Sequence, residues 1–427
     1  MLQPSHRPRI TGGSTRSLDG ARLLSRVLQL LILVVPAIAT GASRVAQDQN
    51  GGLPNVPAIE GLVDVHSLDI YNEANKLHAL VAGRFTGHAN PMLAYLASSD
   101  GGRSWSKPAF VTAESDPPIV SRRGNDAQVA ASGPHLVVAW QQRGQFPTGG
   151  PLRLARSGDN GHTWTQSLLP DIDDPTNNQS YPDLVADASG TFHLVWLDDR
   201  EENGNAQGLR YLNSTDGGRR WSQQTTIDGV VCTCCWNRIG IMPDRSVAVL
   251  YRDDEPHDMR LAVRNKAGSW KDLGSVGDFK WHFAGCPHCG GGFASAIRKN
   301  AAQLHSVVWT GIESAPGLYY LKSSDLGASW LPPFRLGDSS SREADIAALS
   351  ARHIAVVYSI TTGGKGLIHV RQSKDGGKTW SQAKALTKGP ESADHPRIVA
   401  TPFGFRAFWT ERAPGGGRTL TMHSLDS

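Results

Sequence analysis

An octapeptide, Ser-x-Asp-x-Gly-x-x-Trp, occurs five times in this chain and constrains its fold more than any other feature. The five copies begin at residues 98, 157, 214, 323 and 373, and a degenerate sixth ends in Gly268-Ser269-Trp270. The closing tryptophans of the six copies follow one another at intervals of 49 to 60 residues. A repeat of this length indicates an array of similar supersecondary units.

A second pattern, an aliphatic run that ends in an aromatic residue, recurs in phase with the octapeptide. The clearest copy is Leu136–Trp140, and a weaker one at Leu77–Ala82 opens the series without the aromatic residue. The others are Leu194–Trp196, Val249–Tyr251, Val307–Trp309, Val356–Tyr358 and Ala407–Trp409. A short apolar segment precedes each run, and another leads into the octapeptide. Four short strands per unit are typical of one blade of a β-propeller.

The units predict an all-β fold, a β-propeller with seven blades, with six blades as the alternative. The 46 glycines and 25 prolines agree with a turn-rich β protein and exclude a helical bundle. The last unit, residues 393–425, has only three expected strands. A segment near Leu53–Leu62 could supply the fourth strand and close the ring, which would remove exposed sheet edges.

Each residue of the octapeptide has a structural use. The aspartate can accept backbone N–H groups of its own turn, the glycine can adopt a positive φ, and the tryptophan can pack the hairpin onto the next blade. The copies resemble the Asp-box (BNR) repeat of sialidases and related propellers. The resemblance implies one propeller domain over residues 44–427 and an exo-sialidase type of glycoside hydrolase acting on sialic-acid-type or other anionic glycans. Asp-boxes also occur in propellers without glycosidase activity, because fold does not give function.

The first 43 residues have the layout of a secretory signal peptide. Five arginines and one aspartate precede an apolar run, Val27–Ala39, and small residues follow it. An uncleaved anchor is the alternative, although the run is short for a membrane span. We therefore expect a secreted or periplasmic protein that has no membrane contact after cleavage. The remaining chain has nearly equal numbers of acidic and basic residues, which argues against a nucleic-acid partner.

Candidate site residues follow from the expected topology. The octapeptides connect the third and fourth strands, so the starts of the first strands and the ends of the second strands meet on the opposite face. Arginines and carboxylates gather there and suit a glycan or a small anionic ligand. The sialidase resemblance implies an arginine triad, a tyrosine nucleophile with a glutamate partner, and an aspartate acid/base. The candidates by placement are Asp126 as acid/base, Tyr181 as nucleophile, Glu343 as its partner, and Arg252 and Arg397 for the anion.

The match to a sialidase site is incomplete. The family's Phe/Tyr-Arg-Ile-Pro motif is absent, and the nearest segment, His395-Pro396-Arg397-Ile398, lies in the last unit with a different order. Each candidate also fits an ordinary solvated loop or capped turn.

The cysteines form a second irregularity. All five lie in two clusters, Cys232-Thr233-Cys234-Cys235 and Cys286-Pro287-His288-Cys289, just before the first strands of adjacent units. We therefore expect the clusters to lie within reach of each other on the face opposite the octapeptides. Trp236 and Trp281, which the repeats do not explain, flank them.

Three interpretations of the cysteines remain open. An exported protein favours disulfides, here two bridges and one spare thiol. Thiolates also suit a copper or zinc ion, with Cys232, Cys234, Cys235, Cys286, Cys289 and His288 as candidate ligands and His282 nearby. A redox-active dithiol at Cys286 and Cys289 is the third. The metal interpretation gives the second functional hypothesis, a non-catalytic metal-binding propeller.

Overall fold

The structure, a computed structural model, describes residues 59–122, 124–145, 149–167, 178–199, 206–387, 389 and 391–425. The predicted signal peptide, residues 1–43, lies outside these residues. The described chain belongs to one compact unit that starts at Asn50. It contains strands and no helix, so it offers no helical segment that is long and apolar enough to cross a membrane.

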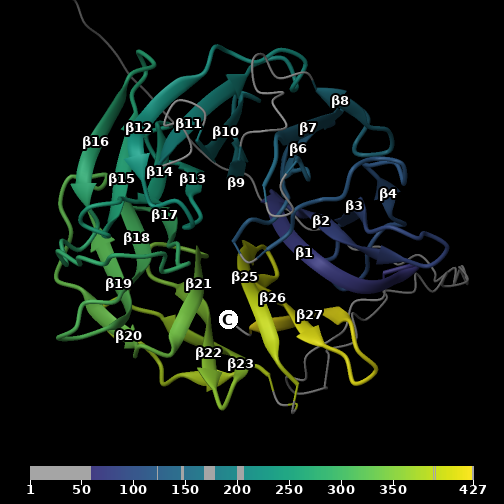
Figure 1. Ribbon diagram of the computed structural model, residues 1–427. Helices are drawn as coiled ribbons and strands as arrows, with labels where there is room; N and C mark the ends of the chain where they lie inside the picture. Colours follow the sequence, from purple (N-terminus) through teal and green to yellow (C-terminus); the bar gives the residue numbers. More distant parts are fainter. Residues whose placement is uncertain are drawn as a thin grey trace, which may run out of the picture. The chain divides into compact units, whose positions relative to one another are not determined.

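The described strands form seven antiparallel sheets that follow one another around a central axis, which confirms the seven-bladed propeller (Figure 1). Blades 1 to 3 consist of β1 (Leu62–Glu73), β2 (Lys76–Phe85), β3 (Met92–Ser98) and β4 (Ala109–Phe110); β5 (Gln128–Ser132), β6 (His135–Gln141), β7 (Leu152–Ser157) and β8 (Thr165–Ser167); and β9 (Gln179–Ala186), β10 (Phe192–Asp198), β11 (Gln207–Ser214) and β12 (Thr225–Val231).

The other four blades continue the same order. They consist of β13 (Arg238–Ile241), β14 (Val247–Arg252), β15 (Met259–Arg264) and β16 (Trp270–Ser275); β17 (Gly292–Arg298), β18 (Ala301–Thr310), β19 (Gly317–Ser323) and β20 (Phe334–Gly337); β21 (Ser341–Ala348), β22 (Ile354–Thr362), β23 (Lys365–Ser373) and β24 (Lys384–Ala385); and β25 (Ala393–Thr401), β26 (Gly404–Arg412) and β27 (Arg418–Leu425). The first strand of each blade lies nearest the axis (Figure 1).

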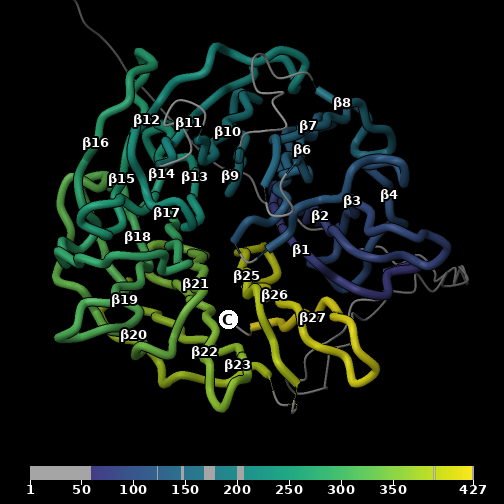
Figure 2. Tube along the Cα trace, in the orientation of Figure 1, coloured from purple at the N-terminus to yellow at the C-terminus, as the bar shows by residue number. Residues whose placement is uncertain are grey.

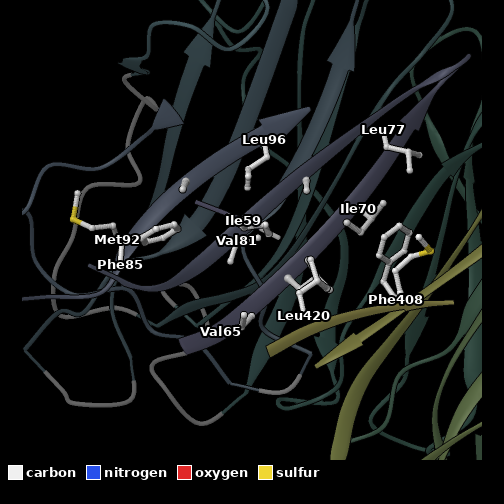
Figure 3. Close-up of a cluster of buried hydrophobic side chains, with 14 residues drawn as sticks. Ile59, Val65, Ile70, Leu77, Val81, Phe85, Met92, Leu96, Phe408 and Leu420 are labelled. Carbon is white, nitrogen blue, oxygen red and sulfur yellow. The ribbon is translucent and has the colours of Figure 1, made fainter. Parts of the chain in front are cut away.

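The ring closes where blade 1 meets blade 7, and the trace in Figure 2 brings the purple and yellow segments together there. Figure 3 shows the hydrophobic cluster at this junction, in which Val65, Ile70 and Leu77 of blade 1 pack with Phe408 and Leu420 of blade 7. Blade 7 has three strands among the described residues, as predicted. The fourth strand expected near Leu53–Leu62 is not seen, because residues 53–58 lie outside the described part and Leu62 begins β1.

The octapeptides form the predicted turns. In blade 1, the Asp100 carboxylate accepts the backbone N–H of Ser104 at 3.0 Å, and the Ser98 hydroxyl accepts the N–H of Gly102 at 2.9 Å. In the degenerate copy Asn265 replaces the aspartate and accepts the N–H of Ser269 at 3.0 Å. These bonds satisfy the turn's own backbone groups, so the motif is structural.

The sequence predicts that the octapeptide tryptophans pack on the next blade, but in the structure they pack on the preceding blade. The ring of Trp164 lies 5.5 Å from that of Tyr95, and the same contact joins Trp270 to Tyr211 at 5.0 Å and Trp380 to Tyr320 at 4.8 Å. Each of these tyrosine hydroxyls lies 2.7 Å from the Nδ1 atom of a buried histidine, namely His78, His193 or His305. A His–Tyr–Trp chain thus links every second pair of blades.

Candidate functional site

A pocket lies at the mouth of the central channel, where the first strands of several blades begin. It contains about 490 Å³ of empty space, part of it open to solvent. Three of the predicted residues line it: Asp126, Glu343 and Arg397. The octapeptide turns lie at the other ends of the sheets, since Ser98 pairs with Leu77 at the start of β2. The pocket therefore lies on the face that the topology predicted.

A repeated β-bulge shapes the pocket. Tyr181, Glu343 and His395 have φ values of 52°, 48° and 56°, and each starts a two-residue bulge in the first strand of its blade. The bulges lie opposite Trp196, Tyr358 and Trp409, the aromatic residues that end the aliphatic runs of the second strands. Non-glycine residues rarely adopt positive φ, and such conformations concentrate at functional sites.

Carboxylates two residues after a bulge connect neighbouring blades. Asp183 accepts the backbone N–H of Ile239 at 2.6 Å, and Asp345 accepts that of Ile398 at 3.0 Å. Asp69 accepts the N–H of Val129 at 2.9 Å in the equivalent position of blade 1. Part of the acidic character of the channel mouth is therefore structural.

The arginines of the pocket are already paired with these carboxylates. The Arg238 guanidinium lies 3.7 Å from Asp183 and 3.3 Å from Asp345. Arg397 pairs with Asp69. Arg238 and Arg397 are the two arginines among the described lining residues, whereas a sialidase-type site needs three. The pocket thus lacks the surplus of positive charge that an anionic sugar would require.

Asp183 is a functional candidate that the sequence did not single out. It lines the pocket with its side chain almost completely buried, and burial raises its pKa to about 6. A carboxyl group with such a pKa retains a substantial protonated fraction close to neutral pH, as a general acid must. Its position two residues after a bulged tyrosine is a signal that only the register reveals.

Trp236 is one of the two tryptophans that lie outside the repeats, and its position in the pocket gives it a role. It lines the pocket, and its indole leaves no room for a side chain at two flanking glycines. A Cβ atom at Gly124 would lie 2.2 Å from the ring, and one at Gly290 would lie 2.3 Å from it. The indole therefore reaches between the strand starts of blades 2 and 5 and forms an apolar wall of the pocket.

Tyr181 does not lie in this pocket. Its side chain is buried and lines a second pocket with Arg122, Cys234 and His288. The hydroxyl lies 3.4 Å from the Nε2 atom of His288, and burial raises the pKa of Tyr181 to about 12. The predicted pair of Tyr181 and Glu343 is therefore divided between two pockets.

Arg252 was a candidate for binding an anion, but its position does not suit that role. Its guanidinium is buried and donates to the carbonyl groups of Cys289 at 2.9 Å, Trp309 at 2.8 Å and His257. It also lies over the ring of Trp281, at 5.3 Å from the ring centroid. Arg252 therefore holds the loops around it together, and it is not among the residues that line the channel-mouth pocket.

The two cysteine clusters meet, as predicted. Cys232, Cys234 and Cys235 lie in the connection from β12 to β13, and Cys286 and Cys289 lie in the connection from β16 to β17. Cys234 and Cys286 form a disulfide, with a Cα–Cα distance of 6.1 Å. Cys232, Cys235 and Cys289 are free thiols, so the structure has one bridge where the disulfide interpretation expects two.

Two groups of side chains in this region have the geometry of metal ligands. The sulfur atoms of Cys232, Cys234 and Cys235 lie within 4.8 Å of one another, as do the ligand atoms of Cys234, Cys286 and His288. Cys289 belongs to neither group, because its sulfur faces the carbonyl of Pro287 and accepts a bond from Arg342, each at 3.2 Å. His282 pairs with Glu255 at the surface.

Comparison with known proteins supports the fold. No protein-family model matches the chain, and no curated protein gives a significant match. A solved PL25 ulvan lyase, a polysaccharide lyase bound to -[GlcA(1-4)Rha3S]-, aligns with a TM-score of 0.57 and 13% identity over 85% of this chain and 94% of the lyase. The polysaccharide lyase Uly1 aligns with a TM-score of 0.51 and 12% identity over 85% of this chain and 90% of Uly1.

A Trypanosoma rangeli sialidase aligns with a TM-score of 0.46 and 11% identity over 88% of this chain and 57% of the sialidase, a likeness too weak to carry an argument. The two lyases show that the chain has their propeller fold, and at these identities they show nothing more.

Proposed function

We propose that the protein is an exported, glycan-active propeller that binds a sugar in the channel-mouth pocket and acts on it with carboxyl groups. The observation that carries this proposal is the convergence of Asp126, Asp183 and Glu343, from three different blades, on one solvent-open pocket. Trp236 adds an aromatic wall on which a sugar face can stack.

Cleavage of a glycosidic bond by paired carboxyl groups requires one protonated and one ionised group. Asp183 suits the first role because burial raises its pKa to about 6. Asp126 and Glu343 line the same pocket and are the candidates for the second role, which is to activate a water molecule or to stabilise positive charge at the sugar.

The charge of the pocket favours a neutral sugar over sialic acid or a uronic acid. Arg238 and Arg397 are committed to Asp183, Asp345 and Asp69, so a substrate carboxylate would meet carboxylates and no free arginine among the described lining residues. The polysaccharide lyases that share the fold support a glycan as the class of ligand.

The test is a screen of the purified mature chain against neutral, uronic-acid and sialic-acid glycan substrates. We expect turnover of a neutral glycan and a loss of about 100-fold or more in kcat for Glu343→Gln or Asp126→Asn. Glu313→Gln, an exposed change outside the pocket, is the matched control and should keep full activity. Absence of any glycan binding or turnover, or unchanged kcat in both pocket variants, would contradict the proposal.

A sialoside reporter separates the sialidase mechanism from this one. Sialidase chemistry would need the hydroxyl of Tyr181, so turnover of the reporter that disappears in Tyr181→Phe would replace the neutral-sugar proposal with a sialidase.

A further inference from the structure

The cysteine loops of blades 4 and 5 carry a second inference, independent of the glycan pocket. We propose that Cys232, Cys234 and Cys235 bind one Cu(I) ion through their sulfur atoms, with Cys286 and His288 at the solvent side of the site.

The distances bring the donor atoms together in a small volume. The Cys232 sulfur lies 2.8 Å from that of Cys235 and 3.9 Å from that of Cys234. Cys286 is bonded to Cys234, and its sulfur lies 3.3 Å from the Nδ1 atom of His288. Five potential ligands from two blade connections thus form two adjacent groups that share Cys234.

The site combines a dry interior with a path to solvent. Cys232, Cys234 and Cys235 are at most 6% exposed and form a buried cluster of their own. Cys286 is exposed, and His288 is half-buried and lines the open pocket beside Tyr181. An ion can therefore enter past Cys286 and His288 and reach sulfur ligands from which water is excluded.

The scaffold fixes both loops around a positive charge. Cys232 donates its N–H to the carbonyl of Arg252 at 3.1 Å, and the Arg252 guanidinium donates to the carbonyl of Cys289 at 2.9 Å. Val231 forms an isolated β-bridge with Asp253 just before the first cysteine. These contacts hold the two cysteine loops next to each other.

The donor set favours a soft cation. Thiolates select Cu(I) and Zn(II) among common metals. Structural zinc sites usually take paired cysteines separated by two to four residues and a tetrahedral arrangement. Here two of the ligands, Cys234 and Cys235, are adjacent in the chain and a third is two residues away, which suits the less demanding geometry of Cu(I).

The disulfide between Cys234 and Cys286 competes with the metal for sulfur. A dithiol reductant donates two electrons to this bond, becomes a cyclic disulfide and leaves two thiols on the protein. Cu(I) then replaces the protons of the coordinating thiols, which pass to the buffer. Copper loading therefore depends on prior reduction.

The test uses the full mature chain, reduced with dithiothreitol, transferred to anaerobic buffer and titrated with Cu(I) held by bicinchoninate. We expect one equivalent of copper to leave the chelator, with a thiolate-to-copper charge-transfer band and copper–sulfur distances in X-ray absorption. The double variant Cys232→Ser/Cys235→Ser should lose at least 100-fold in affinity. Cys289→Ser should keep the wild-type affinity, because this sulfur faces Pro287 and Arg342.

Circular dichroism of each variant reports whether it folds. If the double variant does not fold, Cys286→Ser replaces it, since Cys286 is exposed, and its copper affinity should fall at least tenfold. Failure of the reduced protein to take copper from the chelator would overturn the proposal. Binding of zinc in preference to copper, or undiminished copper binding by the folded cysteine variants, would also overturn it.

Discussion

Aspartates on the two faces of the propeller differ in their surroundings and in their acidity. On the octapeptide face, Asp216 accepts the backbone N–H groups of Arg220 and Arg219 at 2.9 and 3.1 Å, and the bond from Arg220 is the main cause that lowers its pKa to about 2. On the opposite face, burial raises the pKa of Asp183 to about 6. The first face uses a carboxylate to complete a turn, and the second retains a carboxyl group that can hold a proton.

The difference between the two faces indicates where a functional site can lie in a repeat protein. The octapeptide turns are similar in every copy and satisfy their own backbone groups. The opposite face differs from blade to blade: a bulge occurs in blades 3, 6 and 7, and cysteine loops precede blades 4 and 5. Side chains at positions that the repeat does not fix can take part in ligand binding or catalysis.

The largest effect on stability is expected at Arg252, and Arg220 on the octapeptide face is its control. Arg252→Met should lower the free energy of unfolding by about 3 to 5 kcal/mol, because it leaves the buried carbonyl groups of Cys289, His257 and Trp309 without their donor. Arg220→Met, which removes an exposed ion pair with Asp216, should cost less than about 1 kcal/mol. Urea denaturation measures both changes. Equal losses would mean that the two faces do not differ in this respect.

The second prediction concerns pH. Asp183 releases its proton at the ordinary aspartate pKa of 3.8 when the chain is unfolded and at a pKa of about 6 when it is folded. The folded protein therefore binds more protons between these values, so the contribution of Asp183 to the free energy of unfolding decreases as the pH rises from about 4 through 6 and levels off near pH 7.

Asp183→Asn removes this titration but keeps an oxygen that can accept the Ile239 N–H. The stability of the variant relative to the wild type should increase from pH 4 to pH 7 by about 2 kcal/mol. Chemical denaturation at four pH values between 4 and 7 measures the difference. A difference that does not vary with pH would show that Asp183 is ionised in the folded protein throughout.

The smallest effect is expected from a single octapeptide. Ser98→Ala removes the hydroxyl that accepts the Gly102 N–H and donates to Asp100, which should cost about 1 kcal/mol of stability. Glycan turnover should not change, because this turn lies on the face opposite the pocket. Thermal unfolding together with the activity assay checks both expectations. A loss of activity without a loss of stability would place function on the octapeptide face.

The sequence predicted the fold well because the signal was repeated. Five octapeptides and the in-phase aliphatic runs favoured seven blades, with six as the alternative, and left three strands for the last unit. They also placed the starts of the first strands on the face opposite the octapeptide turns. The same repeats gave no direct information about side chains that occur once. The direction in which Trp164 packs, onto Tyr95 of the preceding blade, was predicted wrongly, because the octapeptide spacing does not indicate which neighbouring blade the ring contacts.

The site was predicted only in part, for reasons that individual residues make clear. Asp126, Glu343 and Arg397 were found because strand starts converge at the channel mouth. Tyr181 lines a different pocket from these three residues, and the bulge at its position is visible only in the register. Arg252 ends its strand in the expected place, but tertiary contacts bury it.

The most direct test of the central claim, that the departures from the repeat form the ligand-binding face, is a crystal structure of the reduced protein grown with Cu(I) and measured at the copper absorption edge. We predict one anomalous peak between the sulfur atoms of Cys232 and Cys235. Peaks confined to surface histidines or to the octapeptide face, with none among the cysteines, would contradict the account.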